Sequence, residues 1–234
     1  PVVAIYSTFL QRAYDQLIHD VAVQNLDVTF ALDRSGLVGE DGPTHSGNYD
    51  IAYLRCIPNM VICTPSDENE TRKLLTTAYL HNGPASVRYP RGAGPNSNVD
   101  KDLKPLNIGE ANIINEESSE IVILNFGTLL NEANQISKEL KATLVDMRFV
   151  KPLDEKLLRK LFKKAKVFIS IEDGSIMGGA GSAVQEFASK ENLNVRSILF
   201  GIPDKFIEHA SREEMLVEAG LDIENIQSKL SKLL

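Results

Sequence analysis

Short apolar runs alternate with amphipathic segments along residues 1–92 of the chain. Each apolar run has the length of a buried strand, and each amphipathic segment repeats apolar residues at helical spacing. We expect strands at residues 2–6, 28–32, 60–63 and 85–89, and helices at residues 10–25 and 66–81. Ser66 is the expected N-cap of the second helix, because acidic residues follow it in the first turn. This alternation predicts a parallel sheet flanked by helices.

The same alternation returns after residue 118. We expect strands at residues 120–126, 143–146, 167–172 and 195–201, and helices at residues 130–140, 154–165, 178–190, 211–219 and 222–234. Between the two halves, residues 93–118 show neither period and contain glycine and proline, which is typical of a linker. The sequence therefore predicts an α/β protein of two domains, residues 1–92 and 119–234, each a mainly parallel sheet flanked by helices.

Composition narrows the class of protein further. Hydrophobic residues make up 43% of the 234 residues, mean hydropathy is −0.13, and no apolar run approaches the length of a membrane span. The net charge of −7 disfavours nucleic acid as a partner. Cys56 and Cys63 both sit in apolar contexts, and we expect two buried thiols in a reducing, cytoplasmic setting and not a metal site. No nucleic-acid or membrane partner is expected.

Residues 33–47 form the most informative segment, because a glycine-rich loop with a cation, acids and an imidazole follows a predicted strand. Ligands of open α/β sheets bind beyond the carboxyl ends of the strands, which is where this loop begins. Arg34 can bind an anion, and Asp41 and His45 can hold or move a proton. The plain alternative is a polar surface loop, since glycine and aspartate are common in turns.

The order of residues in this loop closely resembles the signature loop of thiamine-diphosphate enzymes of the transketolase group. The flanking segments narrow the resemblance to the 1-deoxy-D-xylulose-5-phosphate synthase family. The segments that carry it are residues 6–16, 33–47, 53–60, 64–70, 87–92, 144–154 and 176–182. The resemblance implies a transketolase-like fold: a thiamine-diphosphate-binding fold that lacks its first part, followed by a transketolase C-terminal domain.

The resemblance also implies a reaction and its cofactors. Members of this family condense pyruvate with D-glyceraldehyde 3-phosphate and release carbon dioxide, with thiamine diphosphate and Mg²⁺ as cofactors. The family's diphosphate- and metal-binding motif and its activating glutamate have no counterpart in this sequence, so we expect the chain alone to bind no cofactor and to be inactive. A homodimer is expected, with the missing N-terminal portion as a possible separate partner. Two alternatives stay open: the β-subunit of a 2-oxo-acid dehydrogenase, and a non-catalytic dimerising core.

Three residues near the first strand are assigned by the resemblance. Phe9 is the candidate to stack on the aminopyrimidine ring of the cofactor, because an aromatic face fixes a flat ring at low entropic cost. Tyr6 and Arg12 are assigned to the substrate pocket. From the periodicity alone, Phe9 would be a core residue and Arg12 a charge on a helix surface.

Two arginines are the candidate ligands of the substrate phosphate. Arg34 and Arg91 both follow predicted strands. A guanidinium group stays charged and can donate to two phosphate oxygens at once. Parallel strands place both arginines at the same edge of the sheet. Arg88 is either a further phosphate ligand or part of a structural ion pair, and we favour Arg91 because it lies beyond the strand end.

Asp41 and His45 are the candidate catalytic pair. The imidazole can transfer a proton near neutral pH, and the carboxylate can orient it or accept from a substrate hydroxyl. The alternative for Asp41 is a turn with Gly42. In the second half, the glycine-rich helix start at residues 177–182 could bind an anion, but the dinucleotide fingerprint is incomplete and the resemblance assigns this domain to packing and dimer contacts.

Overall fold

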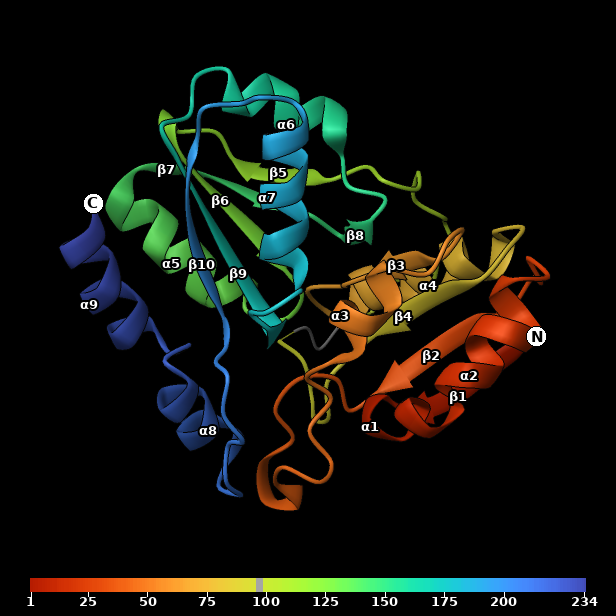
Figure 1. Cartoon of the computed structure of the whole chain (residues 1–234). Helices are drawn as coiled ribbons and strands as arrows, with labels where there is room; N and C mark the ends of the chain where they lie inside the picture. Colours follow the sequence, from red (N-terminus) through yellow and green to blue (C-terminus); the bar gives the residue numbers. More distant parts are fainter. Residues whose placement is uncertain (96–98) are drawn as a thin grey trace.

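The computed structural model describes residues 1–95 and 99–234, so residues 96–98 of the predicted linker lie outside the described residues. Two five-stranded sheets are flanked by helices (Figure 1). The strands are β1 Val2–Tyr6, β2 Thr29–Asp33, β3 Val61–Cys63, β4 Ala85–Arg88, β5 Asn112–Asn115, β6 Ser118–Phe126, β7 Ala142–Asp146, β8 Phe149–Lys151, β9 Val167–Ser175 and β10 Arg196–Ile202. The helices are α1 Ser7–Leu10, η1 Gln11–Ala13, α2 Tyr14–Gln16, η2 Leu17–Ala22, η3 Gly39–Asp41, α3 Asp50–Arg55, α4 Glu68–Leu80, α5 Leu130–Leu140, α6 Glu155–Phe162, α7 Ala180–Lys190, α8 Arg212–Ala219 and α9 Ile223–Leu233.

The first sheet has the strand order β1-β2-β4-β3-β8. Its first four strands are parallel, and β8 from the second half of the chain is antiparallel to β3. Because β2 and β4 are parallel neighbours, the loop after Asp33 and the segment after Arg88 leave the same edge of the sheet. This is the edge on which both predicted phosphate ligands lie.

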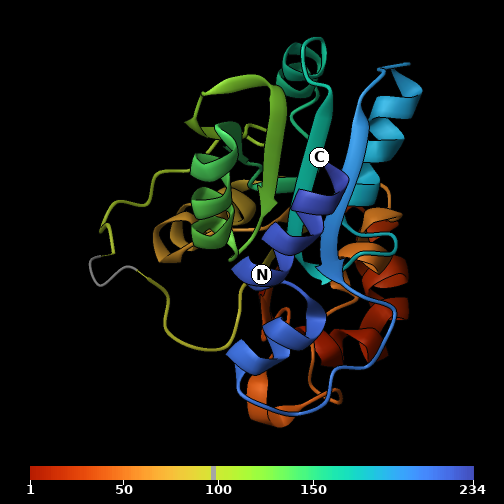
Figure 2. The same cartoon turned by 90° about the vertical axis from the view of Figure 1, so that its left-hand side faces the viewer.

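The second sheet has the order β10-β9-β6-β7-β5, with four parallel strands and an antiparallel β5 at one edge. Along β6, Val122 and Leu124 pack with α6 and α7, whereas Ile123 packs with α5 and α9. This alternation follows the period of two in side-chain direction along a strand. The two helical layers therefore cover opposite faces of the sheet, as Figure 2 shows with α5 and α9 toward the viewer.

One apolar core continues from the first sheet into the second. Leu32 and Ile51 of the first half belong to the same buried cluster as Phe126 and Phe168 of the second half. At the end of β9, the Ser175 amide donates to the carbonyl of Asn48 at 2.7 Å. The carboxyl end of the second sheet thus meets the segment that follows the loop of residues 34–47.

The expected strands and helices are confirmed in outline, with several corrections. The first helix begins at Ser7 and consists of short α, 3₁₀ and π turns down to Ala22. The N-cap of α4 is Asp67 and not Ser66, because the Asp67 carboxylate accepts from the Glu70 amide at 2.8 Å. Ser66 instead donates to Asp146 at 2.6 Å and joins the two halves.

Some secondary-structure elements and the exposure of one cysteine were not predicted. Helix α3 and strand β8 were missed. Cys63 is buried as expected, but Cys56 is exposed, so the expectation of two buried thiols is wrong for Cys56. Within residues 1–95 and 99–234, no helix is long and apolar enough to cross a membrane.

Candidate active site

The loop of residues 34–47, which we call the site loop, is closed at its base, where it leaves the first sheet. We call this closure, made by Gly36 and Gly47, the neck of the loop. The Gly36 and Gly47 amides each donate to the other residue's carbonyl at 2.9 Å. Gly36 has φ +78°, which favours glycine. At Gly47 a Cβ atom would lie 2.4 Å from the Arg34 carbonyl oxygen and 2.7 Å from Ser7 Cβ, so only glycine fits this approach.

Aromatic rings and charged groups gather beside this loop at the end of β1. The rings of Tyr6 and Phe9 stack with centroids 5.3 Å apart, and His45 meets the edge of Phe9 at 5.6 Å. The guanidinium carbon of Arg34 lies 4.3 Å from the centroid of the Tyr6 ring, a cation–π contact. We call this set the arginine–aromatic cluster: Tyr6, Phe9, Arg34, Asp41, His45 and Arg91.

One carboxylate of the cluster pairs with two arginines. Asp41 Oδ2 forms an ion pair with Arg34 Nη1 and accepts from Arg91 Nη1 at 3.0 Å. The side chains of Arg34, Asp41 and Arg91 are 21%, 29% and 44% exposed, so water and solutes reach them. Two cations around one carboxylate leave a net positive charge, which suits a second anion. The structure thus brings the two predicted phosphate ligands together.

The imidazole of His45 is oriented by threonines. Thr44 Oγ1 lies 2.9 Å from His45 Nδ1 and 3.4 Å from the Asp41 carbonyl oxygen, and Thr8 donates to the Thr44 carbonyl at 3.1 Å. When the Thr44 hydroxyl donates to Asp41, it accepts from Nδ1, and this tautomer leaves the Nε2 lone pair for proton transfer. Sequence reasoning missed Thr8 and Thr44, although Thr44 precedes the histidine directly.

For two expectations about this site, the described residues show no supporting contact, and both stay predictions. Of the roles allowed for Asp41, orienting His45 is not seen, because both arginines attract its carboxylate more strongly than a neutral ring does. Arg12 is exposed on η1, and its guanidinium has no hydrogen bond or ion pair within residues 1–95 and 99–234. The structure therefore does not link Arg12 to the cluster.

A second arginine cluster lies beneath the loop and is buried. Arg88 Nε donates to Asp50 Oδ2 at 3.0 Å, and Arg88 Nη1 forms a close ion pair with Asp173. Burial lowers the pKa of Arg88, but Asp173 and Asp50 raise the pKa by a larger amount, so the net shift is upward. We call Arg88, Asp50 and Asp173 the Arg88 cluster. Arg88 therefore takes part in a structural ion pair, which was one of the two roles that the sequence allowed for it.

The glycine-rich start of α7 is filled by the protein itself. The carboxylate of Glu172 accepts from the amides of Ala180 and Gly181 at 2.8 and 2.9 Å. Burial raises the pKa of Glu172 to about 7, although these two amides act in the opposite direction. An internal carboxylate therefore occupies this helix start, which favours the packing interpretation over an anion site.

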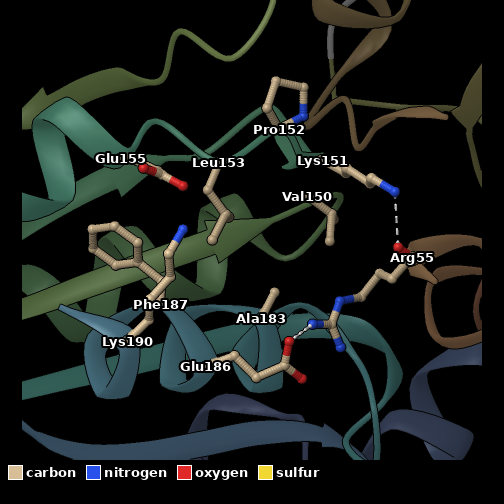
Figure 3. Close-up of a pocket in the computed structure, with 10 residues that line it drawn as sticks. All are labelled: Arg55, Val150, Lys151, Pro152, Leu153, Glu155, Ala183, Glu186, Phe187 and Lys190. Carbon is tan, nitrogen blue, oxygen red and sulfur yellow. Dashed lines mark hydrogen bonds and ion pairs between the residues drawn. The ribbon is translucent and has the colours of Figure 1, made fainter. Parts of the chain in front are cut away.

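Cavities lie between the halves of the chain among the described residues. One, of about 680 Å³, includes Arg91 and Arg212 in its lining. Another, of about 350 Å³, is shown in Figure 3, where Arg55 reaches Glu186 at 2.6 Å and Lys151 donates to the Arg55 carbonyl at 3.0 Å. Among the residues that the structure describes, no group of three or more His, Cys, Asp or Glu side chains is arranged to hold a metal ion.

Comparisons with known proteins agree with this arrangement. A family model described as the pyrimidine-binding domain of transketolase matches residues 1–96, and the model of the transketolase C-terminal domain matches residues 109–226. The chain belongs to the transketolase family. The transketolase-like fold predicted from the sequence is therefore confirmed, with the site loop in the pyrimidine-binding domain and the second sheet in the C-terminal domain.

Individual members of the family are similar over the whole chain. A 1-deoxy-D-xylulose-5-phosphate synthase of Pseudomonas paraeruginosa is 58% identical over 234 residues, and one of Stutzerimonas stutzeri is 60% identical over 235 residues. Both matches include 100% of this chain, which spans 37% of each relative. A solved structure titled a split gene transketolase, inactive beta4 tetramer, has a TM-score of 0.86 and 25% identity, and the match covers 99% of this chain and 75% of that one.

Proposed function

We propose that the chain supplies the acceptor-substrate side of a thiamine-diphosphate-dependent transferase. This transferase condenses pyruvate with D-glyceraldehyde 3-phosphate to give 1-deoxy-D-xylulose 5-phosphate and carbon dioxide. The observation that carries the proposal is the pair of arginines, one half-buried and one exposed, that share Asp41 beside His45 and Phe9. The names of the relatives, which are 1-deoxy-D-xylulose-5-phosphate synthases, support the choice of reaction.

The described residues fit one end of thiamine diphosphate. Phe9 is 45% exposed and lies just beyond the carboxyl end of β1, where its ring can stack on the pyrimidine. When bound, the cofactor supplies the carbanion that attacks the aldehyde. For the diphosphate and Mg²⁺, residues 1–95 and 99–234 offer no acidic metal cluster, so the remaining length of the relatives is the proposed source of that half of the site.

The residues of this chain bind the aldehyde substrate and control one proton. Arg34 and Arg91 exchange the Asp41 carboxylate for the substrate phosphate, because a dianion makes stronger charge-assisted bonds with two guanidinium groups. Asp41 is then free to accept from a substrate hydroxyl. His45 gives or takes the proton of the reacting oxygen at Nε2, held by Thr44 through Nδ1. Tyr6 and Arg12 complete the proposed pocket.

A chimera tests this proposal. The chain replaces the matching region of the Pseudomonas relative, with which it shares 58% of its residues, and product formation is measured with thiamine diphosphate and Mg²⁺. We expect R91A to raise KM for glyceraldehyde 3-phosphate about 30-fold, since a charge-assisted bond contributes about 2 kcal/mol, and to leave KM for pyruvate unchanged. We expect H45A to lower turnover about 100-fold. Equal loss for both substrates in R91A, in a folded chimera, would contradict the proposed phosphate role.

A second candidate applies to the isolated chain. The solved structural relative is titled an inactive tetramer of a split-gene transketolase, which favours a self-associating core without activity. We therefore expect the chain alone to form a homodimer or larger assembly and not to bind thiamine diphosphate with Mg²⁺. Mass photometry and calorimetry check these two points. Saturable micromolar binding, about −8 kcal/mol, by the chain alone would show that the cofactor site is already complete.

A further inference from the structure

Both sides of the site-loop neck are attached to the Arg88 cluster. Arg88 Nη2 donates to the carbonyl of Gly47 at 3.3 Å, on the returning side of the neck. Ser35, on the outgoing side, donates to Asp50 Oδ2 at 3.1 Å. Arg88 and Asp50 are 3% and 0% exposed, so water does not compete for these bonds. The position of the neck therefore depends on the position of the Arg88 guanidinium.

The third member of this cluster comes from the C-terminal domain. Asp173, in β9, pairs with Arg88 Nη1 through Oδ1 and accepts from Thr128 Oγ1 at 2.9 Å through Oδ2. A Cβ atom at Gly36 would lie 3.2 Å from the carbonyl oxygen of Asp173 and 3.2 Å from its Oδ2. Asp173 is thus in contact with the neck itself as well as with the arginine that holds it.

The same domain also covers the tip of the loop. Leu37 and Val38 are 2% and 3% exposed, and Leu37 packs in the apolar cluster of the second sheet. A Cβ atom at Gly42 would lie 2.9 Å from His209 Cβ, in the segment before α8. Figures 1 and 2 both show the loop, in orange, next to this segment, in blue. The C-terminal domain therefore contacts the site loop at two places.

The orientation of Asp173 is itself secured by α8. Arg212 Nη2 donates to Thr128 Oγ1 at 3.2 Å, so a chain of bonds runs from α8 through Thr128 and Asp173 to Arg88. Thr128, Arg88 and Arg212 all favour the ionised form of Asp173, and its pKa is lowered although burial acts in the opposite direction. A permanent carboxylate fixes the guanidinium more firmly than a neutral acceptor would.

We infer that Asp173 is a positioning residue through which the C-terminal domain fixes the neck of the site loop. It does not contact the proposed substrate; it acts through Arg88, Gly36 and Gly47 on the loop that carries Arg34, Asp41 and His45. The catalytic consequence rests on the proposed function, whereas the fixed position of the loop does not. The C-terminal domain is then part of the device that presents the site, in addition to its role in packing.

Amide hydrogen exchange of this chain, read by NMR, tests the inference. D173N keeps the shape of the side chain and removes its charge. We expect exchange at the Gly36 and Gly47 amides to rise at least 10-fold, and exchange at Ile123 in the central strand β6 to stay within about 2-fold. E186Q is the matched control, because Glu186 also pairs with an arginine of the first half, Arg55, without contacting the site loop. It should leave both glycines unchanged.

Three outcomes would overturn the inference. In D173N, exchange at both glycines would stay unchanged, or exchange at Ile123 would rise as much as at the glycines. In E186Q, exchange at the glycines would rise as much as it does in D173N. If D173N does not fold, T128V decides, since it removes one bond to Asp173 and should raise exchange at the same glycines about 3-fold. In the chimera, D173N should raise KM for glyceraldehyde 3-phosphate more than KM for pyruvate. Failure of the chimera alone would count against the proposed function and leave the exchange result standing.

Discussion

Two arginine–aspartate clusters lie at the same edge of the first sheet and differ in their access to water. Arg91 and Asp41 are 44% and 29% exposed, whereas Arg88 and Asp50 are 3% and 0% exposed. An exposed ion pair contributes about 0–1 kcal/mol, so a substrate phosphate can displace its carboxylate. A buried pair cannot open without leaving a charge desolvated. The same two residue types therefore bind ligand in one cluster and fix the loop in the other.

The largest expected effect is on the buried cluster. R88M leaves Asp50 and Asp173 buried without their cation, and should lower the free energy of unfolding by about 3–5 kcal/mol. Urea unfolding of the chain, followed by circular dichroism, measures this loss. A loss below about 1 kcal/mol would mean that the buried pair does not stabilise the fold.

Contact between the loop tip and the C-terminal domain gives the next effect. Gly220 has φ +71° and ψ +30°, where alanine is strained by about 1 kcal/mol, whereas Gly42 has φ +63° and ψ −158°, a combination that essentially only glycine adopts. Only Gly42 faces a close neighbour, His209, whereas Gly220 has nothing within 4 Å. G42A should therefore be less stable than G220A by a further 1–3 kcal/mol, roughly the cost of overpacking. Equal losses in thermal or urea unfolding would show that the tip is not packed.

Glu172, next to Asp173 in sequence, should make stability depend on pH. Its pKa is raised from 4.5 to about 7 in the folded protein, so the folded state binds more protons than the unfolded state between these values. Its contribution is complete below pH 4.5 and is lost as pH rises toward 7. Relative to the wild type, E172Q should thus gain on the order of 1–2 kcal/mol from pH 5 to pH 7. Parallel pH profiles of the two proteins would contradict this shift.

The smallest expected effect on stability is in the exposed cluster. R91Q breaks a solvent-exposed ion pair and should change the free energy of unfolding by less than about 0.5 kcal/mol. Urea unfolding beside R88M measures the contrast directly. A loss comparable to that of R88M would place Arg91 among the structural residues.

The sequence was informative wherever local periodicity decides the structure. Helix α5 and strand β1 have the predicted bounds, and the rule for parallel strands placed Arg34 and Arg91 at one edge. Strand β8 was missed because only two of its three residues are apolar, whereas β3, which is equally short, lies in a fully apolar run from Met60 to Cys63. The resemblance, and not the periodicity, distinguished Phe9 from a core residue.

Long-range pairing was beyond the reach of sequence reasoning. Asp173 lies 85 residues from Arg88, and no local pattern indicates which acidic residue meets a buried arginine. The cover of the site loop by the segment before α8 was not predicted for the same reason. Local cues were also ambiguous for Ser66 and Asp67, since both are favourable N-cap residues and only the contact with Asp146 separates them.

The most direct test of the account is a titration of this chain with sn-glycerol 3-phosphate, followed by NMR of the arginine Nε–H groups. The account predicts saturable shifts at Arg34 and Arg91, which exchange Asp41 for phosphate, and no shift at Arg88. Arg159, whose side chain is 41% exposed and paired with Glu155, and Arg196, which is exposed, are the internal controls for non-specific charge effects. Shifts of equal size at the controls, or no shift at Arg34 and Arg91 up to high millimolar ligand, would contradict the claim that the exposed cluster is a phosphate site.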